Sequence, residues 1–238
     1  MKIDRIILIL FLFTINLFHT FAQSPKPTPQ QLEDKFFEIT RFAELEGVIK
    51  QNKIDVDVVM NYKGKDFPLH VITNGMNIFR GEVNLFGFKF DFVRQDEIFW
   101  MKILGFWKKQ QIPHEDNNPI LNFAEWKDKK LNSHLAGDTL INHVPNWIVQ
   151  YTSYNENHRL YVAKNSGLVT QVRSRYTDKK TGEVSDYLLR FDNYRMFQNV
   201  YAPHKMIVTD FKKGRNFSME IKKALIRNNI PDSYFQTK

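Results

Sequence analysis

The side chains that could catalyse a reaction or bind a metal ion do not occur at the spacings that such chemistry needs. The 238 residues include seven histidines and no cysteine, which excludes thiolate metal sites and cysteine nucleophiles. After residue 22, no two histidines are two, three or four positions apart. The chain also lacks GxSxG, GxGxxG, HExxH and phosphate-binding-loop motifs. The sequence therefore predicts a protein that is not an enzyme and that uses no cofactor.

Two groups of polar residues could still hold a metal ion, and both have a simpler explanation. His114, Glu115 and Asp116 are consecutive in a segment rich in Pro and Asn, where solvated loop residues are expected. Asp55 and Asp57 are two positions apart, a spacing that suits a site shared by two carboxylates. In a half-buried strand, however, the polar positions turn to solvent. We therefore predict no metal site at either group.

The most distinctive pattern is a run of alternating phenylalanines in the segment VNLFGFKFDFV. Residues spaced by two in a strand point to one side, so four rings would share a face. An ordinary sheet core would explain the alternation. Four large rings in succession could instead line an apolar cavity for a ligand, because close-packed cores usually mix side-chain sizes. With two tryptophans that add aromatic area, the candidate ligand-binding residues are Phe86, Phe88, Phe90, Phe92, Trp100 and Trp147.

A helix and a series of strands must position these residues. Thr28, followed by Pro29 and Gln31, is typical of a capped helix start, and apolar residues at helical spacing follow as far as Gly47. From Ile54 on, apolar and polar residues alternate. The alternation predicts about eleven strands, joined by short turns in an antiparallel sheet. The fold class is therefore α+β and mostly antiparallel.

Residues 105–139 interrupt the alternation and are predicted to form a lid or an insertion between strands. Asn118 and Pro119 favour a helix start there, with a helix over residues 120–131.

The N-terminal residues predict a secretory signal peptide over residues 1–22. Two basic residues precede the apolar run Ile6–Phe18, and Thr20 and Ala22 occupy the −3 and −1 positions of a cleavage site. The run is shorter than the roughly 20 residues that span a bilayer, so we expect cleavage and release to the periplasm. Retention as a membrane anchor is the alternative. The single predicted domain then comprises residues 23–238.

The charge balance is basic, with 34 Lys and Arg against 26 Asp and Glu and a net charge of +8. The basic residues are spread along the chain in single positions and short pairs, which favours an ordinary solvated surface. Attraction to anionic lipid or to an acidic partner is the alternative. Nucleic-acid binding is not expected, because it needs a basic cluster.

Four short motifs in the second half of the chain resemble those of the LolA-like family of exported lipoprotein carriers. In chain order they are Ser166-Gly167-Leu168, Phe191-Asp192-Asn193-Tyr194, Pro203-His204-Lys205-Met206 and Ile230-Pro231-Asp232-Ser233-Tyr234-Phe235. The resemblance covers about residues 28–235. It implies an incomplete, curved antiparallel β-barrel, with an N-terminal helix and a helical lid over a concave face that holds acyl chains. Arg80 is the candidate for the arginine that tethers this lid in the family.

The resemblance implies a non-enzymatic periplasmic carrier that binds lipoprotein acyl chains, or a related lipid, for transport towards the outer membrane. A membrane-associated donor or acceptor protein would be its partner. Two alternatives remain open. One is a module on the same fold that binds an envelope protein or senses envelope stress; the other is an enzyme that acts on lipid or glycan. The oligomeric state is not predicted.

Overall fold

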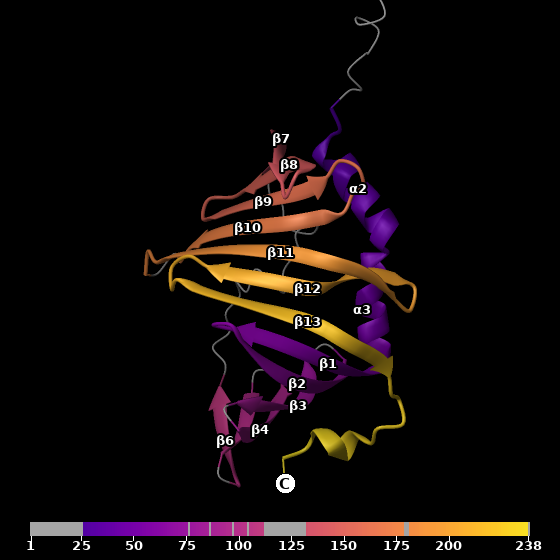
Figure 1. The fold of residues 1–238 in the computed structure, drawn as a ribbon, viewed down its shortest axis with the longest axis vertical. Helices are drawn as coiled ribbons and strands as arrows, with labels where there is room; N and C mark the ends of the chain where they lie inside the picture. Colours follow the sequence, from indigo (N-terminus) through magenta and orange to yellow (C-terminus); the bar gives the residue numbers. More distant parts are fainter. Residues whose placement is uncertain are drawn as a thin grey trace, which may run out of the picture.

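In the part of the chain that it describes, the computed structural model combines two α-helices with one large sheet (Figure 1). The structure describes residues 26–75, 77–85, 87–96, 98–103, 105–111, 132–178 and 181–237. The predicted signal peptide, Phe86, the group at His114 and the predicted helix over residues 120–131 therefore lie outside the described residues. No helix within the described ranges is both long and apolar enough to span a bilayer.

The N-terminal helix begins where the sequence predicts but is divided in two. Helix α2 (Pro29–Thr40) has the predicted capping box, in which Thr28 Oγ1 accepts from the Gln31 amide at 3.2 Å. Arg41 then takes a left-handed φ of 53°, and α3 (Phe42–Gln51) follows. Thr40 Oγ1 donates to the Phe36 carbonyl oxygen at 2.7 Å, a bond that favours a bend. The predicted end at Gly47 is wrong, because α3 continues through it.

The described residues form one antiparallel sheet of thirteen strands in the order β6-β5-β4-β3-β2-β1-β13-β12-β11-β10-β9-β8-β7. The first six strands are β1 (Lys53–Tyr62), β2 (Lys65–Asn74), β3 (Ile78–Leu85), β4 (Phe88–Gln95), β5 (Ile98–Ile103) and β6 (Phe106–Gln111). The others are β7 (Asn132–Ile141), β8 (Val144–Thr152), β9 (Glu156–Ala163), β10 (Val169–Thr177), β11 (Val184–Phe197), β12 (Val200–Asp210) and β13 (Arg215–Ile226). The sheet is open and curved, as expected for a half-barrel (Figure 1).

One strand and most of a second lie inside the predicted interruption at residues 105–139, which is therefore too long. They are β6 and β7, the two edge strands of the sheet. These two additional strands raise the number from the predicted eleven or so to thirteen. An edge strand has one neighbour and many exposed positions, so its apolar alternation is weak. The segment FWKKQQ of β6 shows this, because Lys108 and Lys109 point to opposite faces. A helical lid is not confirmed.

The sheet has one face that packs against α2, which we call the helical face, and an opposite outer face. On the helical face, Leu32 and Phe36 of α2 pack into a cluster of buried side chains. Its members on the sheet are Val149, Tyr151, Leu160, Val162, Val169, Val172 and Leu189. The main core therefore lies between α2 and strands β8–β11.

Hydrogen bonds from two tyrosines fix this end of the molecule. The Tyr151 hydroxyl donates to Oε1 of Glu33 on α2. Burial, and then this hydrogen bond, raise the pKa of Tyr151 above its usual range. The Tyr194 hydroxyl donates to the Val169 carbonyl oxygen at 2.7 Å, and burial raises the pKa of Tyr194 as well. The first bond holds α2 on β8, and the second connects β11 to the start of β10.

Candidate functional site

The helical face of β1–β4 and of the neighbouring β13 carries two rows of apolar cross-strand partners. One row consists of Phe90, Val83, Leu69, Val58 and Ile221, and the next of Phe92, Gly81, Val71, Val56 and Ala224. We call the side chains of these rows the apolar patch. All of them except Gly81 are half-buried, whereas Val149, Val162 and Val169 beneath α2 are fully buried. The patch is therefore less enclosed than the main core, on the same face of the same sheet.

A glycine and two aromatic contacts hold Phe92 within the patch. The Phe92 ring lies 5.9 Å from the ring of Phe99, in a stacked arrangement, and 6.0 Å from that of Phe79, edge to face. A Cβ at Gly81 would lie 2.4 Å from Phe92 Cζ, so the ring crosses β3 directly over this glycine. Such aromatic pairs contribute about 0.5–1.5 kcal/mol beyond area burial. The aromatic part of the patch is thus fixed before any ligand arrives.

The phenylalanine alternation predicted one shared face, and the register confirms it for three of the four rings. Phe88, Phe90 and Phe92 pair with Leu85, Val83 and Gly81 of β3 in successive same-face positions. Phe88 differs from the other two because 68% of its surface is exposed, at the turn between β3 and β4. Phe90 and Phe92 belong to the patch, and Phe88 lies at its end.

The two tryptophans of the predicted site do not join these phenylalanines. Trp100 pairs with Val93, which is next to Phe92 in β4, so Trp100 lies on the outer face. Trp147 is on the helical face, where it packs against the main core with Lys164 Nζ 3.8 Å from its ring centroid. Eight strands lie between β4 and β8 in the sheet. Trp100 and Trp147 therefore do not lie with the described phenylalanines of the predicted site.

Arg80, the predicted lid tether, lies on the outer face and binds the C-terminal segment. Its Nη1 donates to the Tyr234 carbonyl oxygen at 2.7 Å, and the guanidinium lies 5.0 Å from the centroid of the Tyr234 ring. Gln95 Nε2 donates to the Phe235 carbonyl oxygen at 2.9 Å. Phe235, in the short helix η2 (Asp232–Phe235), is 2% exposed. Arg80 thus holds the end of the chain against the outer face; contact with a lid is not among its described interactions.

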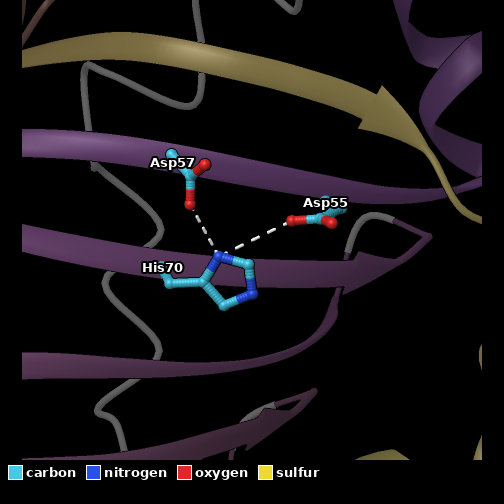
Figure 2. Close-up of side chains that lie close together, drawn as sticks. All are labelled: Asp55, Asp57 and His70. Carbon is cyan, nitrogen blue, oxygen red and sulfur yellow. Dashed lines mark hydrogen bonds and ion pairs between the residues drawn. The ribbon is translucent and has the colours of Figure 1, made fainter.

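The outer face also carries a polar cluster that the sequence predicted only in part. Asp55 and Asp57 of β1 point towards His70 of β2 (Figure 2). His70 Nδ1 lies 2.8 Å from Asp57 Oδ1 and 3.6 Å from Asp55 Oδ1, and Arg227 Nε lies 3.4 Å from Asp55 Oδ2. Alternation placed both carboxylates on the polar face correctly. It could not identify His70, because the partner depends on the register between β1 and β2.

These three side chains are the residues that could hold a metal ion in the described part of the chain. Their oxygen and nitrogen donors lie within 4.8 Å of one another, and such donors suit several divalent ions. All three side chains are at least partly exposed. Asp57 already contacts His70 and Asp55 already pairs with Arg227, so both carboxylates have partners without an ion. The prediction that no metal site exists here stays a prediction.

Comparison with known proteins identifies the fold. No family model and no curated protein matches the chain. Among solved structures, a LolA superfamily protein from Nitrosomonas europaea matches with a TM-score of 0.54 at 13% identity, covering 89% of this chain and 99% of that chain. The chain has the LolA-like fold. A DUF1329 family protein from Desulfovibrio piger also matches, with a TM-score of 0.51 at 13% identity over 86% of this chain and 97% of that chain.

The LolA-like fold was the expectation drawn from the four short motifs, and the comparison confirms it. At 13% identity the likeness concerns the fold and not individual residues. Any binding function of this chain must therefore be argued from its own side chains.

Proposed function

We propose that the protein is a non-enzymatic periplasmic carrier that holds the acyl chain of a lipoprotein, or of a related lipid, against the apolar patch on its way to the outer membrane. The observation that carries the proposal is the patch itself, two rows of half-buried apolar side chains on the helical face of a LolA-like fold. Periplasmic location rests on the signal peptide predicted at residues 1–22.

The physical need for such a surface is simple. An acyl chain does not cross water unaided, since each exposed methylene group costs about 0.8 kcal/mol. The patch offers apolar area that the main core does not use. Because Phe92 is already held by Phe79 and Phe99, little side-chain ordering opposes binding. Because the two rows carry no charged side chain, they bind the acyl chain only through apolar contact. The acyl chain can therefore be released again.

The proposed contacts follow from the geometry. Phe90 and Phe92 would lie along the acyl chain together with Val58 and Leu69, and Phe88 would contact it at the end of the patch. The proposed role of Phe86 stays a prediction. Trp100 is not included, because it lies on the outer face.

Adjacent valines on β1 allow a matched test of this proposal. Val58 belongs to the patch, whereas Val59 points to the outer face, and both are half-buried. Val58→Asp should weaken binding of a fluorescent fatty acid at least tenfold, because an ionised carboxylate cannot be buried against an acyl chain without a large penalty. Val59→Asp should bind like the unmodified protein. Circular dichroism of both variants checks that the sheet has formed.

Native mass spectrometry of the protein purified without detergent identifies the cargo. A bound mass that denaturation releases as lipid or acylated peptide supports the carrier. Equal fatty-acid affinity of folded Val58→Asp and Val59→Asp would reject the patch as the binding surface. A protein free of lipid that co-purifies with an envelope protein would favour the binding-module alternative.

A further inference from the structure

The turns at one end of the strands form a continuous rim of the sheet. Antiparallel pairing of consecutive strands brings every second turn to the same end. Tyr62 at the end of β1 pairs with Phe217 near the start of β13, so the turns before β13 share this end with the turn after β1. The rim therefore comprises the turns β1–β2, β3–β4, β5–β6, β8–β9, β10–β11 and β12–β13.

The helices lie towards the other end of the strands. A Cβ at Gly167, in the turn between β9 and β10, would come within 3.0 Å of Lys35 and Ile39 of α2. The turn between β12 and β13 lies at the end of the sheet away from both helices (Figure 1). The rim is thus distinct from the end that α2 packs against.

The exposed aromatic side chains of the described residues gather on this rim. Four of the exposed large apolar side chains are aromatic: Phe88 (68% exposed), Phe106 (76%), Phe211 (49%) and Tyr154 (97%). They lie at the turns β3–β4, β5–β6, β12–β13 and β8–β9, which are all turns of the rim. One exposed aromatic ring needs no explanation. Four exposed aromatic side chains at one end of the sheet indicate a surface that contacts an apolar environment.

Exposed lysines accompany these rings. Within three residues of the rim turns they are Lys63, Lys65, Lys89, Lys108, Lys212 and Lys213. Lys89 pairs with Glu82 at 2.5 Å and Lys212 with Glu183 at 2.8 Å. The exposed acids at the same turns, Asp66, Glu82 and Glu183, are fewer than the six lysines. The rim is therefore aromatic and positively charged at once.

We propose that this aromatic rim docks the protein on the surface of an anionic membrane. Aromatic side chains favour the boundary between headgroups and acyl chains, and each lysine near an anionic surface adds about 1 kcal/mol of attraction. A protein partner is the weaker choice, because lysine is depleted in the cores of protein interfaces. The rim differs from the apolar patch, and docking does not require that the patch binds an acyl chain.

Vesicle flotation tests this proposal with the protein purified without detergent. The unmodified protein should float with vesicles of phosphatidylglycerol and phosphatidylethanolamine at low salt, and at least tenfold less with pure phosphatidylcholine vesicles. The double variant Phe106→Ser/Phe211→Ser should lose at least tenfold in binding. Leu140 and Met196 are exposed apolar residues at the opposite end of the strands. The double variant Leu140→Ser/Met196→Ser should therefore bind like the unmodified protein.

Three outcomes would overturn the proposal: no flotation of the unmodified protein, equal binding of the two double variants, or equal binding to anionic and neutral vesicles. Residues 1–25 are the same in all variants. If these residues bound the vesicles, the two double variants would therefore float equally. Fatty-acid affinity in solution separates this test from that of the proposed function. The Phe106→Ser/Phe211→Ser variant should keep that affinity, while Val58→Asp should keep flotation.

Discussion

Gly81 leaves the space that the Phe92 ring occupies on the apolar patch. Gly81 lies beneath the Phe92 ring, and its own φ is not in the left-handed region. Glycine is thus needed here for space and not for backbone conformation. Gly81→Ala should destabilise the protein by about 1–3 kcal/mol, the usual cost of overpacking, because the new Cβ displaces Phe92. Urea unfolding measures this change.

Gly47 in α3 provides the control for this prediction. A Cβ at Gly47 meets nothing within 4 Å, so Gly47→Ala should stabilise the protein by about 0.5–1 kcal/mol through helix propensity. If Gly81→Ala were as stable as Gly47→Ala, Phe92 would not be held over β3 as described.

Tyr151 gives a second prediction at this scale. Tyr151→Phe removes the hydrogen bond to Glu33 and should cost about 1–2 kcal/mol at neutral pH. Because the pKa of Tyr151 is raised in the folded protein, its stabilising effect is complete below the unfolded pKa near 10 and is lost as the pH rises above it. The difference between the two proteins should therefore shrink in alkaline solution.

Tyr154→Phe is the matched control, since Tyr154 is 97% exposed and the same change should leave the free energy of unfolding within about 0.5 kcal/mol. An equal effect of both substitutions, or a Tyr151→Phe difference that grows above pH 10, would contradict the structure.

The residue pattern predicted which side chains of one strand share a face of the sheet, but not how that face continues in the next strand. Alternation correctly placed Phe88, Phe90 and Phe92 on one face. Trp100 was grouped with them, although the turn between β4 and β5 returns it on the opposite face. A change of one residue in register moves a whole strand to the other face. The sequence alone does not determine this register.

At the scale of the elements, the C-terminal segment that contains the motif at residues 230–235 packs on the outer face of the sheet. The motif at residues 230–235 was recognised as part of the family order, but its position on the outer face was not predicted. Lys53 Nζ donates to the Ile230 carbonyl oxygen at 2.6 Å and pairs with Asp232 at 2.6 Å. Together with the bonds of Arg80 and Gln95, these bonds fix the segment against β1, β3 and β4.

Phe235→Ala should therefore destabilise the protein by about 3–5 kcal/mol, as expected for the loss of a buried aromatic ring. The emission of Trp107 should change as well, since the Arg80 guanidinium lies near both Trp107 and Tyr234. Ser233→Ala, at an exposed position of the same helix, should leave both measurements unchanged. A Phe235→Ala variant as stable as Ser233→Ala would mean that the segment is not docked in solution.

Strands could be predicted from the sequence wherever one face of the strand is buried. The alternation of β1, β2 and β8–β13 follows from an apolar helical face. The edge strands β6 and β7 were missed because an edge strand has one neighbour and many exposed positions, which weakens the apolar alternation. The break at Arg41 was missed because nothing in the residue types around it forbids a continuous helix.

In the whole molecule, burial is uneven. Apart from Val93, the largest fully buried apolar side chains lie on β8–β12. Amide hydrogen exchange should therefore be slowest in β9 and β10 and fastest in β5 and β6. A bound fatty acid should slow exchange in β2–β4 specifically. Uniform protection along the sheet, or slowest exchange in β5, would contradict this distribution.

The four motifs predicted the architecture through their resemblance to the LolA-like family, whereas alternation and short turns predicted only an antiparallel sheet. The sequence could not show that the main core and the apolar patch are separate parts of one face. That division depends on where α2 lies, and its position is set by Leu32, Phe36 and the Tyr151–Glu33 bond.

An open sheet also raises the question of how the protein avoids aggregation. Among the described residues, β6 and β7 each have only one partner strand, so each has an edge that could pair with a second molecule and start a fibre. On β6, Lys108 and Lys109 place a charge on each face, so a second strand would have to approach two lysines. On β7, the register shifts between Leu135 and Gly137, and a strand with such a bulge pairs poorly with a regular one. The sheet can thus stay open without recruiting other copies through its edges.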